Sequence, residues 1–351
     1  MSRSIVIESV TEAWARTRAV LLTRPDPGRW LKYAFIAMLG VGTMSGSSFN
    51  FSLPGGPSGG ESGDWTGPGE MGPEALRMMA SAARWLGESL GALVALAVGL
   101  TLIWIAVVLV AAYLKSVFRF IFVEAVAAPT EPSIRRAFLR HSGRGLALLL
   151  WYIVIGMVPL ILILLALIPI LASAGLISSG RPLGTVLGAG GILALVGLIV
   201  FAVLLLIMFR ALTEDFLVPA MYAKRSGVIE GWRSVARAWQ GELANVVVFY
   251  IVKLGLGLGV GIVMAFAVIL SLVLLVLPAL SLALIVGLIA LANVGWQASV
   301  LAFGLPALIT LILGGATYGY LLQVLLLPMT VFFQAYSLSF IGKLDPALRT
   351  F

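Results

Sequence analysis

Few side chains in this chain are of the types that carry out acid–base, nucleophilic or metal chemistry. His141 is the one histidine, and no cysteine is present to act as a nucleophile or a metal ligand. Glu214 and Asp215 are adjacent, so on a helix they would point about 100° apart rather than form a facing carboxylate pair. We therefore predict a protein that is not an enzyme and has no catalytic residue, metal site or cofactor. His141 is expected to be an ordinary side chain of an interfacial helix.

Charged residues near apolar stretches are the other candidates for a site. Lys253 lies inside a long apolar run, where an unpaired charge is costly. We expect its side chain to reach the membrane surface or to pair with Glu214 or Asp215, and a substrate or proton pathway is the alternative. Arg210 and Glu214 have i, i+4 spacing and would pair on one helix face.

A second pair of charges lies near the end of an earlier apolar stretch. Glu124 follows Arg119 by five residues, a place equivalent to that of the charges around Glu214. We interpret both sets as structural, which leaves no candidate for a coupled ion pathway apart from Lys253.

The composition indicates what kind of protein must position these residues. Of the 351 residues, 61% are hydrophobic and 11% are charged, and the mean hydropathy is +1.09. These values exclude soluble domains, disordered chains and disulfide scaffolds. They predict an all-α integral membrane protein, because helices satisfy their own backbone groups within the bilayer.

The basic residues are concentrated in four stretches of the chain. Residues 1–32, 115–144, 210–242 and the tail after Ile341 hold 19 of the 23 Lys and Arg residues. The Gly/Pro-rich stretch 45–74 contains four acidic residues and no basic one. Cytoplasmic loops of membrane proteins carry an excess of Lys and Arg, so we expect both termini to be cytoplasmic and the number of spans to be even.

Uncharged runs of about 20 residues locate the expected spans. Four of them are 33–53, 89–114, 146–173 and 186–209. The 89 residues between Lys253 and Lys343 carry no formal charge, a length that allows two long spans or four short ones. We favour two, with 278–298 as an apolar connector, which gives six spans in all.

An internal repeat supports six spans. Residues 9–14, 133–138 and 228–232 share an apolar position, polar or small residues and a final aromatic residue. Each opens a basic amphipathic stretch before an apolar run, which predicts three repeats of an interfacial helix followed by a transmembrane hairpin. Within one membrane domain, 1–351, the repeat units are about 5–128, 131–224 and 226–345, and 45–74 is an extracytoplasmic insert in the first.

The basic amphipathic stretches provide the expected contact surface. Arg136, Arg140 and Arg144 recur at every fourth position and would form one stripe on a helix. Together with Arg233 and Arg237, they are predicted to contact anionic headgroups at the cytoplasmic face or a protein partner. A homo-oligomer is also compatible with the sequence, and nucleic acid is not an expected partner.

One segment resembles a known group of membrane proteins. Residues 215–222, Asp-Phe-Leu-Val-Pro-Ala-Met-Tyr, followed by Gly231-Trp232, resemble a recurring segment of prokaryotic polytopic membrane proteins. That group is similar to the membrane domain fused to some glycerophosphodiester phosphodiesterases. The resemblance covers roughly 115–345 and implies a helical domain of the prokaryotic inner membrane without assigned catalytic residues, so phosphodiesterase activity is not expected.

Three classes of function follow from these features. The first is a non-catalytic integral membrane protein that serves as a scaffold or accessory subunit of a membrane complex. The alternative is a transporter or channel for a small or lipidic solute, although the scarcity of intramembrane charge argues against ion coupling. A lipid-modifying enzyme is the least favoured, because the chain offers no nucleophile or metal-binding set.

Overall fold

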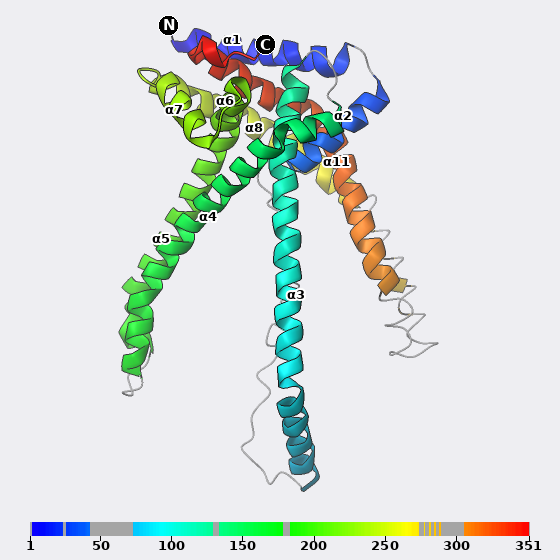
Figure 1. Ribbon diagram of the computed structural model, residues 1–351, viewed down its shortest axis with the longest axis vertical. Coiled ribbons are helices and arrows are strands. Elements are labelled where there is room, and N and C mark those ends of the chain that lie inside the picture. Colours follow the sequence, from blue (N-terminus) through cyan, green and yellow to red (C-terminus); the bar gives the residue numbers. More distant parts are fainter. Residues whose placement is uncertain are drawn as a thin grey trace. The chain divides into compact units, whose positions relative to one another are not determined.

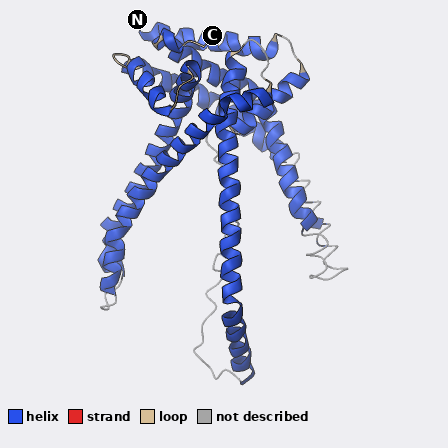
Figure 2. Cartoon of the chain, viewed as in Figure 1, coloured by secondary structure: helices blue, strands red, loops and turns tan. Residues whose placement is uncertain are grey.

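The part of the protein that the structure describes is almost entirely helical. The computed structural model describes residues 2–23, 26–42, 73–128, 133–177, 183–273 and 305–350, with a few positions between 277 and 288. No strand occurs among these residues (Figures 1 and 2). The prediction of an all-α fold is confirmed.

Among the described residues, five helices are long and apolar enough to cross a membrane, so the chain is a multi-pass membrane protein. They are Val94–Ala127, Ile134–Leu165, Val196–Lys224, Leu243–Ser271 and Leu313–Leu344. The sixth expected span, 33–53, is not among them. Its first part belongs to helix α2 (Pro27–Gly40), whose 14 residues extend over only about 21 Å, and 43–53 lie outside the described residues. Most of the expected connector 278–298 also lies outside them.

The chain divides into two units, Met44–Leu114 and the remainder. The described part of the first is the beginning of helix α3 (Pro73–Ala127). Between Val94 and Val110 its side chains are largely exposed and apolar, which suits a surface in contact with lipid. All contacts described below lie within the other unit, formed by Met1–Thr43 and Lys115–Phe351, which we call the main unit.

The main unit brings distant segments of the chain together. Helix α1 and helix α2 pack along helix α11, while α4 and α5 form an antiparallel hairpin (Figure 1). A π-helical turn, η2, joins α5 to α6. The further elements are α1 (Ser2–Thr17), η1 (Arg18–Leu22), α4 (Ile134–Ile177), α5 (Leu183–Leu212), η2 (Thr213–Leu217), α6 (Val218–Lys224), α7 (Val228–Ala238), α8 (Leu243–Ser271), α11 (Leu305–Leu344) and η5 (Pro346–Leu348).

The expected break between the second interfacial helix and the span that follows it is absent. The sequence predicted a separate interfacial helix over about 131–146, but α4 runs without interruption from Ile134 to Ile177. That prediction was wrong, because no proline interrupts its first turns and isolated glycines are tolerated in a helix. Helix α3 likewise continues through Arg119 to Ala127. Among the described residues, α7 is a separate helix ahead of the span formed by α8, whereas α1 is followed by η1 and by α2, which is not one of the five spans.

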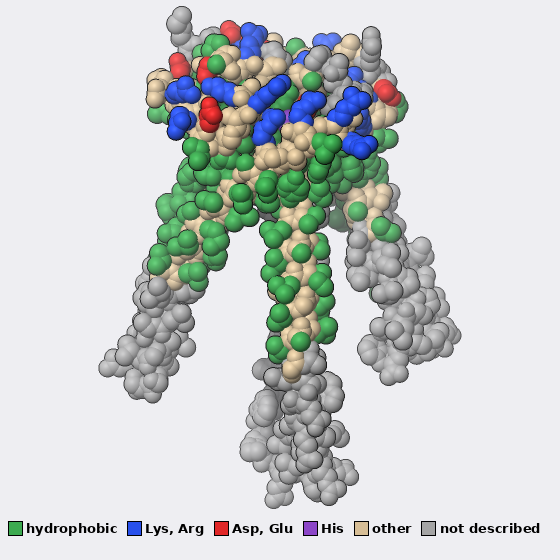
Figure 3. All heavy atoms as spheres, viewed as in Figure 1, with side chains coloured by type: hydrophobic (Ala, Val, Ile, Leu, Met, Phe, Trp, Pro, Cys, Tyr) green, Lys and Arg blue, Asp and Glu red, His purple; other side chains and the backbone are tan. Residues whose placement is uncertain are grey.

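A buried aromatic cluster lies where η2, α8 and α11 meet. Phe249 stacks between Tyr336 and Phe340, with ring centroids 4.5 Å and 4.6 Å apart. Phe216 of η2 packs against Phe249 at 5.3 Å. Along α4 and α5, by contrast, many apolar side chains are exposed, while Lys and Arg side chains gather near the other end of these helices (Figure 3). The main unit therefore has a packed polar end and lipid-exposed spans.

Two features attach neighbouring helices closely to the end of α3. Arg16 of α1 donates from Nε to the Val126 carbonyl at 2.8 Å and from Nη2 to the Ala127 carbonyl at 2.6 Å. These bonds satisfy carbonyl groups that a helix end leaves without partners. Gly40 of α2 lies directly against the α3 backbone, which excludes a side chain larger than hydrogen there, and Gly145 of α4 lies against Val117 of α3, whose side chain would have to move to make room for a Cβ.

Candidate functional site: a buried charge network

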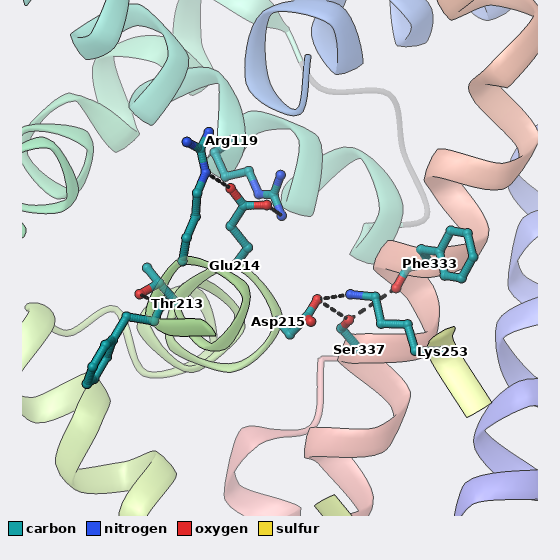
Figure 4. A network of polar contacts seen from close by, with 9 residues as sticks. Arg119, Thr213, Glu214, Asp215, Lys253, Phe333 and Ser337 are labelled. Atoms are coloured by element: carbon teal, nitrogen blue, oxygen red, sulfur yellow. Dashed lines mark hydrogen bonds and ion pairs between the residues drawn. The ribbon is translucent and has the colours of Figure 1, made fainter. Parts of the chain in front are cut away.

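The π-helical turn η2 holds the two adjacent carboxylates of the network. Its first residue, Thr213, donates to the Phe209 carbonyl at 2.7 Å and accepts from Trp151 Nε1 at 3.1 Å. Glu214 and Asp215 then diverge, as Figure 4 shows. Each carboxylate therefore meets a different set of cations, and the two do not form a facing pair.

Glu214 accepts from two arginines. Its Oε2 lies 3.2 Å from Arg119 Nη2 of α3, and its Oε1 lies 3.2 Å from Arg210 Nε of α5. The structure thus contains the i, i+4 contact between Arg210 and Glu214 that the spacing suggests. Arg119 is buried, whereas Arg210 is partly exposed, so the cluster extends from the interior to the surface.

Asp215 connects η2 to α8 and α11. Its Oδ1 accepts from Lys253 Nζ of α8 and, at 3.1 Å, from Ser337 Oγ of α11 (Figure 4). The Ser337 hydroxyl also lies 3.1 Å from the Phe333 carbonyl oxygen. The sequence suggested Glu214 and Asp215 as candidate partners of Lys253, and in the structure Lys253 pairs with Asp215. This contact holds three helical elements around one buried carboxylate.

Glu124, near the end of α3, contacts α4 rather than Arg119. Its Oε1 accepts from Arg140 Nη1 at 2.7 Å, and its Oε2 lies 2.7 Å from His141 Nε2. His141 is buried and stacks on Phe120, with centroids 5.9 Å apart. The structure therefore places His141 in an internal contact, which the expectation of an ordinary interfacial side chain did not include. The first turns of α4 pack on α3 and enclose the imidazole, which helical periodicity alone did not indicate.

The predicted lipid-contact arginines differ in their surroundings. Arg136 on α4 and Arg233 and Arg237 on α7 are exposed. Arg140 is exposed for 57% of its side chain while it pairs with Glu124. Arg144 is partly buried and interacts electrostatically with Arg140 and Arg225. On α4, therefore, Arg136 and Arg140 are exposed, and Arg140 also forms an ion pair with Glu124 inside the main unit.

Two features of the main unit escaped the sequence analysis. One is the convergence of Lys115 and Arg119 with Arg210 on Glu214, which depends on how α3 packs against α5. The other is a cavity of about 350 Å³ lined mainly by α1, α11 and the chain end, including Glu8, Glu12 and Lys343. The charged residues of both features can be read from the sequence. No local sequence pattern indicates that they come together in the folded protein.

The chemistry of the network is that of ion pairing. Glu124, Glu214 and Asp215 each accept from a cationic side chain or contact the buried histidine. Among the residues that the structure describes, no cluster of three or more His, Asp or Glu side chains could hold a metal ion. The arrangement can join helices and can present excess positive charge to an anion.

Comparison with known proteins gives a family but no activity. The model of a family of unknown function, DUF7544, matches residues 5–351. No curated protein and no solved structure matches the chain. The match covers nearly the whole chain and carries no link to the membrane domains of glycerophosphodiester phosphodiesterases.

Proposed function

We propose that the chain, which belongs to the DUF7544 family of unknown function, is a non-catalytic integral membrane protein that acts as a scaffold or accessory subunit of a membrane complex. Its basic helix ends contact anionic lipid headgroups at the cytoplasmic face of a prokaryotic inner membrane. The observation that carries this proposal is the position of exposed arginines beside exposed apolar residues on the same helix.

Helix α4 shows this position most clearly. Arg136 and Arg140 are exposed in its first turns, and from Leu146 onward many of its exposed side chains are apolar. A helix with this pattern has its cations at headgroup level when its apolar part lies in the hydrocarbon layer. Each basic residue near an anionic surface contributes about 1 kcal/mol of attraction.

The packing of the two chain ends supports the proposed topology of six spans in three hairpin units with both termini cytoplasmic. Ser339 of α11 donates to Glu12 of α1 at 2.6 Å, and Lys343 lies 3.4 Å from both Glu8 and Glu12. Helices whose polar ends pair in this way lie on one side of the membrane. A chain whose two ends lie on the same side of the membrane crosses it an even number of times.

Replacing Arg136, Arg140 and Arg144 together with glutamine is expected to weaken binding of anionic lipid to the full-length protein. We expect a loss of roughly 100-fold, because three surface cations that each contribute about 1 kcal/mol together contribute about 3 kcal/mol. The measurement is titration of the protein in mild detergent with phosphatidylglycerol, with phosphatidylcholine as the neutral comparison. The anionic preference of the wild type should fall at high salt, since screening shortens to about 3 Å at 1 M.

The matched control replaces the same three arginines with lysine. This variant retains the charge and is expected to retain both the affinity and its salt dependence. Wild-type preference for phosphatidylglycerol in the glutamine variant would show that the stripe is only a solvated face, and the lipid proposal would be abandoned.

A further inference from the structure

Three cationic side chains converge on one carboxylate where α3 meets the end of α5. Lys115 and Arg119 lie one helical turn apart on α3, Arg210 lies near the end of α5, and Glu214 follows on η2. Lys115 interacts electrostatically with the other three residues. Because Glu214 neutralises one of three positive charges, the cluster keeps an excess of two. We call these residues the α3–α5 cation cluster.

Arg119 at the floor of this cluster is incompletely paired. Its side chain is only 7% exposed, and its contact with Glu214 uses Nη2. The Nε and Nη1 groups are buried and have no hydrogen-bond partner among the residues that the structure describes. Leaving a buried charged donor without a partner is unfavourable, and native proteins contain few such groups. An acceptor is therefore missing from this site.

Lys115 is the second cation of the cluster that lacks a direct partner among the described residues. It forms no ion pair or hydrogen bond with the described residues, although it is partly buried. Two buried or half-buried cations near one another are unfavourable unless an anion joins them. The same anion that accepts from Arg119 would neutralise the charge of Lys115.

The position of the α3–α5 cation cluster along α3 and α5 indicates the source of such an anion. Lys115 directly follows an uncharged stretch of α3, 89–114, and Arg210 follows an uncharged stretch of α5, 183–209. The first charge after a long apolar stretch lies at headgroup level. Arg210 is 41% exposed and lies over the Tyr152 ring at 6.0 Å, so one side of the cluster is open to a headgroup.

We propose that the α3–α5 cation cluster binds a phosphate group, supplied by an anionic phospholipid headgroup or by free phosphate. Phosphate offers several acceptor oxygens, and the guanidinium fork of Arg119 can donate to two of them. The inference rests on the proposed contact with anionic lipid, but it names residues other than the Arg136, Arg140 and Arg144 stripe. It adds one defined, saturable site to a diffuse basic surface.

The test uses the full-length protein in mild detergent, titrated with phosphatidylglycerol and separately with inorganic phosphate. Lys115→Gln and Arg210→Gln are each expected to weaken saturable binding about tenfold, the effect of one lost charge-assisted contact. Lys115→Gln removes no contact between described residues, so its melting temperature should stay close to that of the wild type. The glutamine stripe variant, tested in parallel, should keep the saturable site even if it loses diffuse binding.

The two sources of phosphate are distinguished by competition. Displacement of phosphatidylglycerol by millimolar inorganic phosphate identifies a free-phosphate site, whereas lipid retention identifies a headgroup site held also by its acyl chains. Unchanged affinity of both Lys115→Gln and Arg210→Gln for both probes would overturn the inference. Loss of binding in the stripe variant alone would overturn it as well, while leaving the broader lipid proposal intact.

Discussion

Replacing Lys253 with methionine is expected to lower the free energy of unfolding by about 3 to 5 kcal/mol, because it leaves a buried carboxylate without its cation. Asp215 is 6% exposed and would retain Ser337 as its hydrogen-bond donor. The loss would loosen the junction of η2, α8 and α11. The measurement is reversible unfolding by denaturant in detergent micelles, or thermal unfolding where reversibility fails.

Lys343→Met is the matched control for Lys253→Met. The two lysines are almost equally exposed, at 25% and 26%, but the partners of Lys343 are carboxylates with greater access to solvent. Exposed pairs contribute about 0 to 1 kcal/mol. The double variant Lys253→Met with Asp215→Leu should regain much of the stability, because an apolar pair avoids the desolvation cost. Equal stability of the two single lysine variants would assign Lys253 to a role other than holding the helices.

Alanine at Gly40 is expected to destabilise the protein by about 1 to 3 kcal/mol or more, because overpacking at this site cannot be relieved by a side chain. A Cβ at this position would lie 2.6 Å from the Phe118 carbonyl oxygen and 2.8 Å from the Arg119 backbone nitrogen. Gly145→Ala meets Val117 Cγ2 at 2.4 Å and should have a smaller effect, because that methyl group can move. Both are measured by thermal unfolding.

Gly143→Ala provides the control on the same helix as Gly145. A Cβ at Gly143 would meet no heavy atom within 4 Å. Alanine favours a helix over glycine by about 1 kcal/mol, so this variant should equal or exceed the wild type in stability. A Gly40→Ala protein as stable as Gly143→Ala would contradict the close packing of α2 on α3.

The helical membrane class was predictable because it depends on composition and on the length of uncharged runs. Those runs also indicated the apolar parts of α3, α4 and α5, whereas α8 and α11 lie at the two ends of one uncharged stretch for which the sequence allowed two spans or four. The unbroken course of α4 was not predictable from the basic stripe, since amphipathic periodicity is the same for an interfacial helix and for the first turns of a span. Packing on α3 distinguishes an interfacial helix from the first turns of a span, and this packing depends on residues far away in the sequence.

Part of the candidate site was predictable for a similar reason. Lys253, Glu214 and Asp215 stand out as charges beside long apolar runs, and the i, i+4 spacing of Arg210 and Glu214 is visible directly. The pairing of Arg119 with Glu214 could not be predicted from the sequence. Glu124 is nearer to it in sequence, but the two lie on one helix and face different neighbours. Contacts between helices depend on their register, which neighbouring residues do not determine.

The most direct test of the account is the side of the membrane on which the basic helix ends lie. The chain has no cysteine, so single cysteines can be introduced at Ser133, the exposed residue before α4, and at Ser62 in the acidic Gly/Pro-rich stretch. With a membrane-impermeant maleimide, we expect labelling of Ser133→Cys only from the cytoplasmic side and of Ser62→Cys only from the opposite side. Labelling of Ser133→Cys from outside the cell, or of both positions from the same side, would contradict a cytoplasmic basic face.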